Sequence, residues 1–559
     1  MNKTISPDQR AAKASPAAKK YSMVITSVPR GTKATPERHS RERVEALLAR
    51  RASWLFVLFV IIGSARIVAT YNIFSHTYDE PAHIACGMEW LSKGQYSYEA
   101  QHPPLARVMT ALLPYLFGAH SMGHPTMWAE GAAILSANPY DKTLALARLG
   151  ILPFFWLAAW VVYQWSKRTL GELTALFATF LFTFLPPVLA HSGLATTDMA
   201  LTATFGAAFL TMLIWMQTPT WKWSVLFGIS LAAAVLSKFS VLAFFPSAAV
   251  VALLVYFVIE RPTPGFILEF VRTRSLRFAV ALGVALMLIW AGYRFSFVNN
   301  VPAPELFKGI QDVMQHNAEG HPSYLLGKNG NTGWWYFYLV DLTFKTPLAL
   351  LVLLVVGMVE CWKNRRTPGG RYWIPAAFAL GILIFASLFS RINIGVRHVL
   401  PMYFGFCIIA AAGAGRLWSA KSAAAQWILA ALLFWMATTS ILSHPDYLPY
   451  FNQLAGDQPE KILVESDLDW GQDLKRLLAR LHQLGATDAN IQVHGYALTR
   501  PLNPEAPAPG WNAVSLTVLK VTRMGLGEMK PEFDPWPNWT QPTERVGKSI
   551  LLYYFRPAR

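Results

Sequence analysis

Long apolar stretches separated by short basic segments dominate the chain between residues 52 and 442. Examples are Trp54–Ile62, Ile151–Tyr163 and Phe278–Trp290, and many Trp and Tyr residues lie at the ends of such stretches. Apolar runs that approach 20 residues can cross a bilayer as helices, and Trp and Tyr are enriched where such helices leave it. The pattern predicts an α-helical polytopic membrane protein with about eleven transmembrane helices. The expected spans are about 53–72, 143–165, 172–190, 197–216, 222–237, 240–258, 278–293, 346–361, 373–389, 399–413 and 424–442.

Basic residues between the spans predict the orientation. Lys167-Arg168, the loop Arg261–Arg277 and the run Lys363–Arg366 fall on the same side as the N-terminal arm when the spans alternate. Lys and Arg are enriched on the cytoplasmic side of membrane proteins. We therefore expect a multi-pass protein of the inner (cell) membrane, with a cytoplasmic N-terminus and a periplasmic C-terminal region.

Composition divides the chain into three expected regions. Residues 1–51 are rich in Lys, Arg, Ser, Pro and Ala, which predicts a disordered basic cytoplasmic arm. Residues 52–442 form the transmembrane domain, and residues 443–559 predict a small external α/β domain. Its expected elements are strands at Lys461–Glu465, Ile491–Tyr496 and Ser549–Phe555 and a helix at Asp473–Gln483.

The first external segment, residues 73–142, contains two amphipathic stretches. They are Pro81–Leu91 and Leu105–Phe117. Amphipathic helices beside a membrane often lie in the plane of its interface. We expect both stretches to form such surface helices.

Overall composition supports a membrane protein and argues against a nucleic-acid partner. The chain is 53% hydrophobic and only 14% charged, with a mean hydropathy of +0.31. Its net charge is +17, but the basic surplus lies in the arm and in the short loops, where it suits orientation and anionic lipid headgroups. The three cysteines show no metal-ligand spacing and predict no disulfide framework.

Charged and histidine side chains gather on the external side of the predicted topology. Placing a charged side chain at membrane depth costs free energy, so each such residue needs a structural or functional explanation. A single interfacial Arg or Lys is usually structural. Their convergence on one face is informative, because a few acids and several cations suit a site that holds a phosphate and activates a hydroxyl. The residues are Asp79, Glu80, His102, Arg148, His191, Asp198, Lys238, Arg294, Lys345, Arg391 and Arg397.

The strongest local feature is Tyr78-Asp79-Glu80-Pro81, directly after the first span. The acids could cap the helix that follows, with Pro81 in its first turn. Alternatively, Asp79 could act as a general base for an acceptor hydroxyl, which requires a carboxylate within hydrogen-bond reach. A capping position would also fix a catalytic side chain, so the two interpretations are compatible.

Several short motifs resemble the family 39 glycosyltransferases of the GT-C fold, which include protein O-mannosyltransferases and bacterial aminoarabinose transferases. The resemblance covers roughly residues 50–445, and its most specific part is the Asp-Glu pair followed by the His-Pro-Pro-Leu tetrad. The lipid-modifying bacterial members carry a Lys where His102 stands, so this chain is closer to the mannosyltransferase pattern. The matching motifs are Asp79-Glu80, His102-Pro103-Pro104-Leu105, Ala147-Arg148-Leu149, Thr197–Leu201, Ser237-Lys238-Phe239 and Asn393–His398.

The resemblance implies roles for particular residues. Asp79 would be the catalytic base, Glu80 would lie beside it, and Asp198 would be the second acid that orients cations or acceptor. The phosphate of a polyprenyl-phosphate sugar would be bound by Arg148, Lys238 and Arg397, with His102 nearby. For acceptor or sugar binding the candidates are His191, Trp334 and Trp335, although the two tryptophans suit an interfacial belt equally well.

The implied chemistry is a single displacement. Fixed cations stabilise a departing polyprenyl phosphate, and one base activates the acceptor hydroxyl for attack from the opposite face, which inverts the anomeric centre. No covalent carboxylate intermediate is needed. The reaction requires no cofactor or metal, although Asp79, Glu80, His102 and His191 could hold a divalent ion.

An acid-rich segment, Glu465–Asp473, invites a metal-loop interpretation. It lacks the glycine and the terminal glutamate of an EF-hand loop. We favour a strand end in which Asp469 caps a helix that starts near Asp473.

Three functional classes remain open on the sequence alone. The leading one is an inverting transferase that moves a sugar from a polyprenyl-phosphate donor to a protein, lipid or glycan hydroxyl on the external face. A transporter or flippase of lipid-linked sugars is the main alternative, but transporters tend to show repeated halves and midplane charges. A non-catalytic subunit of an envelope-polysaccharide assembly would tolerate the loss of Asp79.

Overall fold

The computed structural model describes residues 36–367, 371–497, 509–522 and 541–556. The chain divides into two compact units, Met1–Arg50 and Arg51–Arg559. In the smaller unit, helix α1 spans Pro36–Arg50, where the sequence predicted disorder. The stretch is filled with Glu, Arg, Ala and Leu, which favour helix formation. Residues 1–35 of the predicted arm lie outside the described residues.

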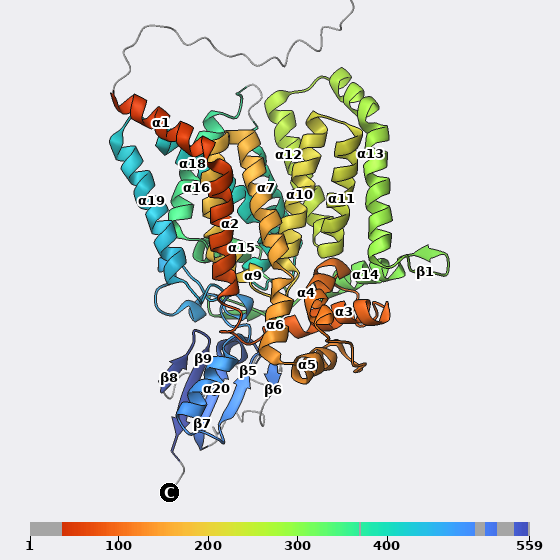
Figure 1. The fold of residues 1–559 in the computed structure, drawn as a ribbon, viewed down its shortest axis with the longest axis vertical. Helices are drawn as coiled ribbons and strands as arrows, with labels where there is room; N and C mark the ends of the chain where they lie inside the picture. The colour runs from red at the N-terminus through yellow and green to blue at the C-terminus, as the bar shows by residue number, and fades with distance from the viewer. Residues whose placement is uncertain (1–35, 368–370, 498–508, 523–540, 557–559) are drawn as a thin grey trace, which may run out of the picture. The chain divides into compact units, whose positions relative to one another are not determined.

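Long apolar helices make up most of the larger unit, and Figure 1 shows them running lengthwise beside one another. Between them lies an apolar core rich in aromatic rings, such as Phe209 against Trp165 and Phe378. The helices are α2 (Ala52–Val68), α7 (Leu152–Leu170), α8 (Glu172–Thr183), α10 (Asp198–Gln217), α11 (Trp221–Ser237), α12 (Val241–Glu260), α13 (Pro264–Gly292), α16 (Leu348–Lys363), α17 (Ile374–Leu388), α18 (Met402–Ser419) and α19 (Ala423–Leu442).

The protein is a mostly helical, multi-pass membrane protein. In the described residues, five helical segments are long and apolar enough to cross a membrane, and the number rises to eight if each of three bent helix pairs forms one span. Two of these pairs are α8 with α9 (Pro186–Ser192) and α15 (Phe337–Lys345) with α16. Each of the predicted spans overlaps a helix of the structure. The total of about eleven crossings stays a prediction.

The basic loop predicted at Arg261–Arg277 is wrong over most of its length. Helix α13 begins at Pro264 and continues without a break to Gly292. Pro264 occupies the first turn, and the Thr263 side chain accepts a hydrogen bond from the Phe266 amide, which completes an N-cap. The arginines of this stretch therefore extend a helix.

Four helices lie between α2 and α7: α3 (Glu80–Lys93), α4 (Pro104–Leu116), α5 (Met127–Ala137) and α6 (Tyr140–Leu149), and α6 and α7 together make one of the candidate spans. The predicted helices at Pro81–Leu91 and Leu105–Phe117 are confirmed. The residues of α3 from Glu80 to Glu89 are all buried in the protein. The predicted position of the two helices on the membrane surface stays a prediction. A side chain at Gly87 would lie 1.9 Å from the Arg107 carbonyl oxygen, so this glycine permits the contact between α3 and α4.

Smaller elements connect the later helices. Helix α14 spans Pro304–Glu319, and two short hairpins pair β1 (Phe297–Val298) with β2 (Val301–Pro302) and β3 (Ser323–Leu325) with β4 (Lys328–Gly330). The 3₁₀ turn η3 (Val396–Val399) precedes α18. This turn carries Arg397 and is part of the candidate site.

The C-terminal region contains a five-stranded mixed sheet in the order β6-β5-β7-β9-β8, with helix α20 (Leu474–Gln483) on one face. On the other face, Val514 and Leu551 pack with Val464 and Leu468. Whether the region is a separate domain stays a prediction, since it lies within the larger compact unit. The strands are β5 (Asn490–Val493), β6 (Tyr496–Ala497), β7 (Gly510–Ser515), β8 (Glu544–Val546) and β9 (Ile550–Phe555).

The predicted C-terminal elements are partly right. The helix at Asp473–Gln483 and the strand at Ser549–Phe555 correspond to α20 and β9, and Ile491–Tyr496 spans the hairpin of β5 and β6. The strand predicted at Lys461–Glu465 is wrong. The 3₁₀ turns η5 (Pro459–Lys461) and η6 (Glu465–Asp467) occupy its two ends, because this segment packs across the sheet instead of pairing within it.

Candidate active site

The first charged pair of the site is fully buried. Arg148 of α6 donates from Nε to Glu80 Oε1 and from Nη2 to Glu80 Oε2, both at 2.9 Å, and the two side chains are 1% and 0% exposed. Glu80 also accepts the backbone N–H groups of Thr77 and Ala195. Burial alone would raise the pKa of Glu80, but Arg148 and these hydrogen bonds hold it below its usual value. The pair therefore joins α3, α6 and the turn before α10.

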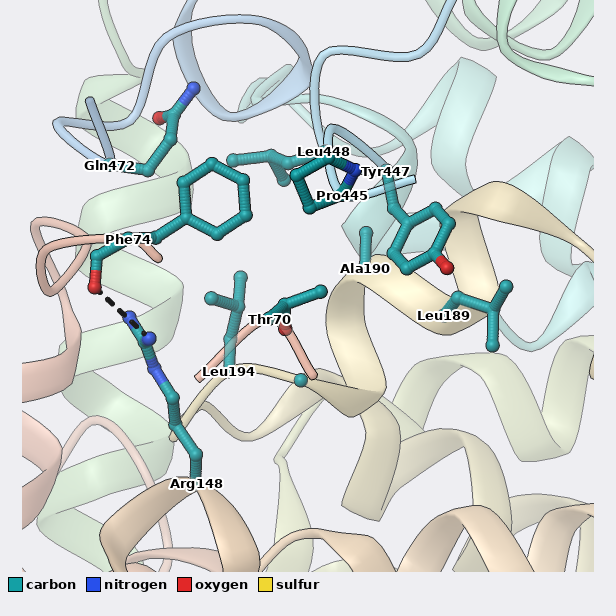
Figure 2. Close-up of a pocket in the computed structure, with 11 residues that line it drawn as sticks. Thr70, Phe74, Arg148, Leu189, Ala190, Leu194, Pro445, Tyr447, Leu448 and Gln472 are labelled. Carbon is teal, nitrogen blue, oxygen red and sulfur yellow. Dashed lines mark hydrogen bonds between the residues drawn. The ribbon is translucent and has the colours of Figure 1, made fainter. Parts of the chain in front are cut away.

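Arg148 has no N–H group left for a phosphate. Its remaining donors bond to the carbonyl oxygens of Tyr71, Phe74 and Ser75, so all five guanidinium hydrogens are used. Figure 2 shows Arg148 pointing at the Phe74 carbonyl, at the edge of a cavity of about 30 Å³. That volume holds about one water molecule. All polar groups of the pair are thus occupied by protein partners, which favours a structural role. The predicted roles of Arg148 in phosphate binding and of Glu80 in catalysis stay predictions.

The second charged group surrounds Asp79, which occupies the N-cap position of α3 without making a side-chain capping bond. Arg397 Nη1 donates to Asp79 Oδ2 at 2.8 Å and lies 3.9 Å from Asp198 Oδ2. Lys238 Nζ contacts Asp198 Oδ1 at 2.6 Å. We call these four residues the Asp79 cluster. The structure thus brings together four predicted site residues from four separate segments.

The Asp79 cluster has an unused hydrogen-bond acceptor and is partly open to solvent. The Asp79 side chain is 23% exposed. Asp198 Oδ2 is buried and has no hydrogen-bond partner among the described residues. Burial alone would raise the pKa of Asp79, but Arg397, followed by His83 and His102, holds it below its usual value. Asp79 is therefore an ionised carboxylate with access to a ligand.

His102 lies near this cluster within a second network. Its Nδ1 is 3.3 Å from Glu99 Oε1, and Arg107 pairs with the same Glu99. The His102 ring is 5.3 Å from that of His83. His102 is thus close enough to act on Asp79, while its phosphate-binding role stays a prediction.

The three predicted acceptor or sugar ligands have different surroundings. His191 is buried, its ring centroid lies 6.4 Å from that of Trp470, and its Nδ1 has no hydrogen-bond partner in the described part of the chain. The Trp334 amide donates to Asn393 Oδ1 at 2.6 Å, whereas Trp335 is 64% exposed. Within the described ranges, no hydrogen bond or ion pair joins either tryptophan to the Asp79 cluster. Their roles stay predictions.

The C-terminal region supplies residues that the sequence did not predict for the site. Arg397 Nε donates to Ser466 Oγ at 3.1 Å, and the guanidinium lies 4.1 Å from the centre of the Trp470 ring. Glu465 Oε1 lies 3.9 Å from Arg397 Nη2, and burial raises the pKa of Glu465. The acid-rich pattern of this segment was visible in the sequence, but nothing in it indicated the partner Arg397, 69 residues earlier.

The predicted cap at Asp469 is wrong. Its carboxylate accepts the backbone N–H of Thr517 at 2.6 Å, and Asp473 occupies the N-cap position of α20. Asp473 in turn accepts hydrogen bonds from the Lys548 amide and the Ser549 hydroxyl. No group of three or more His, Cys, Asp or Glu side chains in the described residues is arranged to hold a metal ion.

One protein-family model matches part of the chain. The family model described as dolichyl-phosphate-mannose-protein mannosyltransferase matches residues 56–300. The match contains Asp79, His102, Asp198 and Lys238, and it confirms the resemblance to this group of glycosyltransferases. No curated protein sequence matches the chain.

Solved structures with a similar chain trace include ArnT, a protein O-mannosyltransferase complex and an oligosaccharyltransferase. ArnT from Cupriavidus metallidurans, bound to undecaprenyl phosphate, is 18% identical over 73% of this chain and 68% of its own, with a TM-score of 0.49. The protein O-mannosyltransferase Pmt1–Pmt2 complex of S. cerevisiae, bound to the sugar donor, is 18% identical over 44% and 33%, with a TM-score of 0.35. The oligosaccharyltransferase AglB from Archaeoglobus fulgidus is 12% identical over 70% and 56%, with a TM-score of 0.42.

Proposed function

We propose that the protein is an inverting glycosyltransferase. It moves a sugar from a polyprenyl-phosphate-linked donor to an acceptor hydroxyl on the non-cytoplasmic face of a bacterial inner membrane. The observation that carries this proposal is the partly exposed Asp79 carboxylate, which contacts Arg397 and shares a cluster with Lys238. The family match over residues 56–300, which contains Asp79 and Lys238, supports glycosyl transfer.

The cluster supplies the groups that one displacement needs. Asp79 accepts the proton of the acceptor hydroxyl as its oxygen attacks the anomeric carbon. The bond between that carbon and the phosphate oxygen breaks, and polyprenyl phosphate leaves with the bonding electrons. Lys238 and Arg397 stabilise the negative charge on the leaving phosphate. Asp198 contacts Lys238 and lies near Arg397, so it positions both cations.

The positions of charges along the helices support the non-cytoplasmic location. Asp198 stands at the start of α10 and Lys238 directly follows the end of α11. The basic pair Lys167-Arg168 ends α7, and Lys363 ends α16, in segments that the positive-inside rule assigns to the cytoplasm. The Asp79 cluster therefore belongs to the opposite side of the predicted topology.

The test compares membranes that carry wild-type protein with membranes that carry Asp79→Asn at equal expression. Labelled polyprenyl-phosphate hexoses and pentoses are supplied, and donor consumption is followed with the label in protein, lipid and glycan fractions. We expect consumption to fall by about a hundredfold or more, since a positioned base contributes about 10²–10⁴ in rate. Asp312→Asn removes a carboxylate that pairs with Lys308 on α14, and it serves as the matched control.

Each outcome has a defined meaning. Loss of consumption in Asp79→Asn but not in Asp312→Asn supports the transferase, and the labelled fraction gives the acceptor class. Equal consumption in wild type and Asp79→Asn removes Asp79 from the mechanism. Donor that crosses the membrane unconsumed would support a flippase.

A further inference from the structure

Three aromatic rings meet next to Asp79 and have no part in the mechanism above. The Tyr78 ring lies 4.7 Å from Trp128 and 5.0 Å from His494, and it is nearly parallel to the histidine, at an interplanar angle of 21°. Tyr78 precedes α3, Trp128 starts α5, and His494 lies in the turn between β5 and β6. Tyr78 and Trp128 are 39% and 37% exposed, so each presents part of its ring to solvent beside the half-buried His494.

Hydrogen bonds and a glycine hold these rings in place. The Tyr78 amide donates to the Trp470 carbonyl at 3.0 Å, and the His494 amide donates to Ser515 Oγ at 3.1 Å. Gly495 has a φ of +84°, and a Cβ there would lie 3.1 Å from Tyr78 Cδ2. A left-handed turn without a side chain therefore lets the His494 hairpin approach the Tyr78 ring closely.

Two carboxylates of the candidate site interact electrostatically with the aromatic group or its neighbours. Burial raises the pKa of Tyr78, and the charge of Asp79 adds to this effect. His494 acts on the pKa of Glu465, and both Asp79 and His494 act on that of His321. The rings are thus within electrostatic reach of the proposed base and of Glu465.

We propose that Tyr78, Trp128 and His494 form an acceptor subsite that stacks on a carbohydrate ring, so that the acceptor is a glycan. Flat aromatic faces suit the apolar face of a sugar ring, and a few placed polar groups fix its orientation. Carboxylates such as Asp79 and Glu465 accept hydrogen bonds from sugar hydroxyls. Tyr78 and Asp79 are neighbours in the chain and the charge of Asp79 acts on Tyr78, so a sugar ring bound here would bring its hydroxyls close to the base. This inference rests on the proposed function.

The experiment measures binding without turnover. Purified full-length protein in detergent is titrated against fluorescently labelled mannotetraose, maltotetraose and a Ser/Thr-rich peptide, and fluorescence anisotropy is recorded. We expect the wild-type protein to bind one of the oligosaccharides. Trp128→Ala should weaken that binding about 3- to 10-fold through loss of the stacked ring, and Trp128→Phe should keep most of it.

Two other tryptophans provide comparisons. Trp427→Ala removes an exposed tryptophan from α19 and should leave oligosaccharide binding unchanged. Trp335→Ala tests the location that the sequence suggested for sugar binding. A loss of affinity in Trp335→Ala but not in Trp128→Ala would overturn the proposal.

The remaining outcomes separate the subsite from the transferase. Failure of wild type to bind either oligosaccharide overturns the subsite, and so does binding of the peptide alone. Suppose that donor consumption depends on Asp79 but that Trp128→Ala does not change oligosaccharide affinity. That result supports the transferase and overturns the subsite. Weaker oligosaccharide binding by Trp128→Ala in a protein that consumes no donor supports a carbohydrate-binding site at these rings but overturns its role as an acceptor subsite, together with the transferase.

Discussion

Asp79 and Glu80 are neighbours in the chain, and each contacts an arginine at 2.8–2.9 Å, yet their surroundings are opposite. Glu80 and Arg148 are excluded from solvent, and every guanidinium hydrogen of Arg148 has a protein acceptor. Asp79 is partly exposed, and Arg397 is shared among three carboxylates, two of them 3.9 Å away. An acid–arginine pair therefore links helices in the protein interior at Glu80, whereas at Asp79 it is partly open to solvent and accessible to a ligand.

The comparison shows that a charged side chain with all its hydrogen bonds made inside the protein has a structural role. A charged side chain of the same type with unused hydrogen-bonding groups can bind a substrate. A buried ion pair is stable only when its remaining donors and acceptors are also satisfied. A site for a charged substrate needs groups that can exchange a protein partner for the substrate. Asp198 Oδ2 and Asp79 meet that requirement, whereas Glu80 does not.

The largest expected effect is on stability, at Arg148. Arg148→Gln leaves Glu80 as a buried carboxylate without its cation, which should destabilise the protein by about 3–5 kcal/mol. The free energy of unfolding of the solubilised protein, measured by denaturant titration, checks this value. Donor consumption per folded molecule should stay close to wild type.

Asp79→Asn gives the opposite result in the same two measurements. Its stability should remain near that of wild type, while donor consumption is lost. If Arg148→Gln were as stable as wild type but inactive, Arg148 would be a substrate ligand and the division between the two pairs would fail.

The second effect concerns Arg397 and the pH dependence of the rate. In wild type the pKa of Asp79 lies below its usual value, so the carboxylate stays ionised as the pH falls from about 7 to about 5. Arg397→Gln removes the main opposing charge and leaves burial, which raises the pKa. The acid limb of kcat/KM should therefore move to higher pH, and the rate at neutral pH should fall by about 10²–10³ through lost phosphate stabilisation.

The profile of kcat/KM from about pH 4 to about pH 7 decides this point. An acid limb at the same pH in both proteins would show that Arg397 does not control Asp79. If the acid limb moved but the rate at neutral pH did not change, Arg397 would lower the pKa of Asp79 without binding the phosphate.

Much of the fold could be predicted because apolar length and basic flanks are local properties. The long helices appear where the apolar runs are, and α3 and α4 follow the two amphipathic stretches. Burial of α3 under its neighbours depends on contacts that no local pattern records. The continuation of α13 through Arg272 and Arg277 is different, because the helix starts at a local N-cap, Thr263 followed by Pro264, that the basic-loop interpretation did not use.

The site shows the same limit. Asp79, Asp198, Lys238 and Arg397 could be predicted because costly charges near helix ends stand out and match family motifs. The division between Asp79 and Glu80 could not, because it depends on the Ala195 amide, which lies 115 residues from Glu80. Ser466 and Trp470 could not be assigned either, since their importance comes only from contact with Arg397.

The smallest expected effect tests whether the C-terminal region contributes to the site. Ser466 Oγ accepts a hydrogen bond from Arg397 Nε at 3.1 Å and donates to the Ile394 carbonyl. Ser466→Ala should loosen the guanidinium and lower kcat/KM about fivefold, which corresponds to about 1 kcal/mol. The matched control is Ser440→Ala, because Ser440 Oγ accepts a hydrogen bond from Arg66 at 2.9 Å, outside the Asp79 cluster. Both variants lose one buried serine–arginine bond, so similar stability with a lower rate only in Ser466→Ala assigns the C-terminal segment to the site. Equal kcat/KM values for Ser466→Ala and wild type would show that Ser466 has only a structural role, like the Glu80–Arg148 pair.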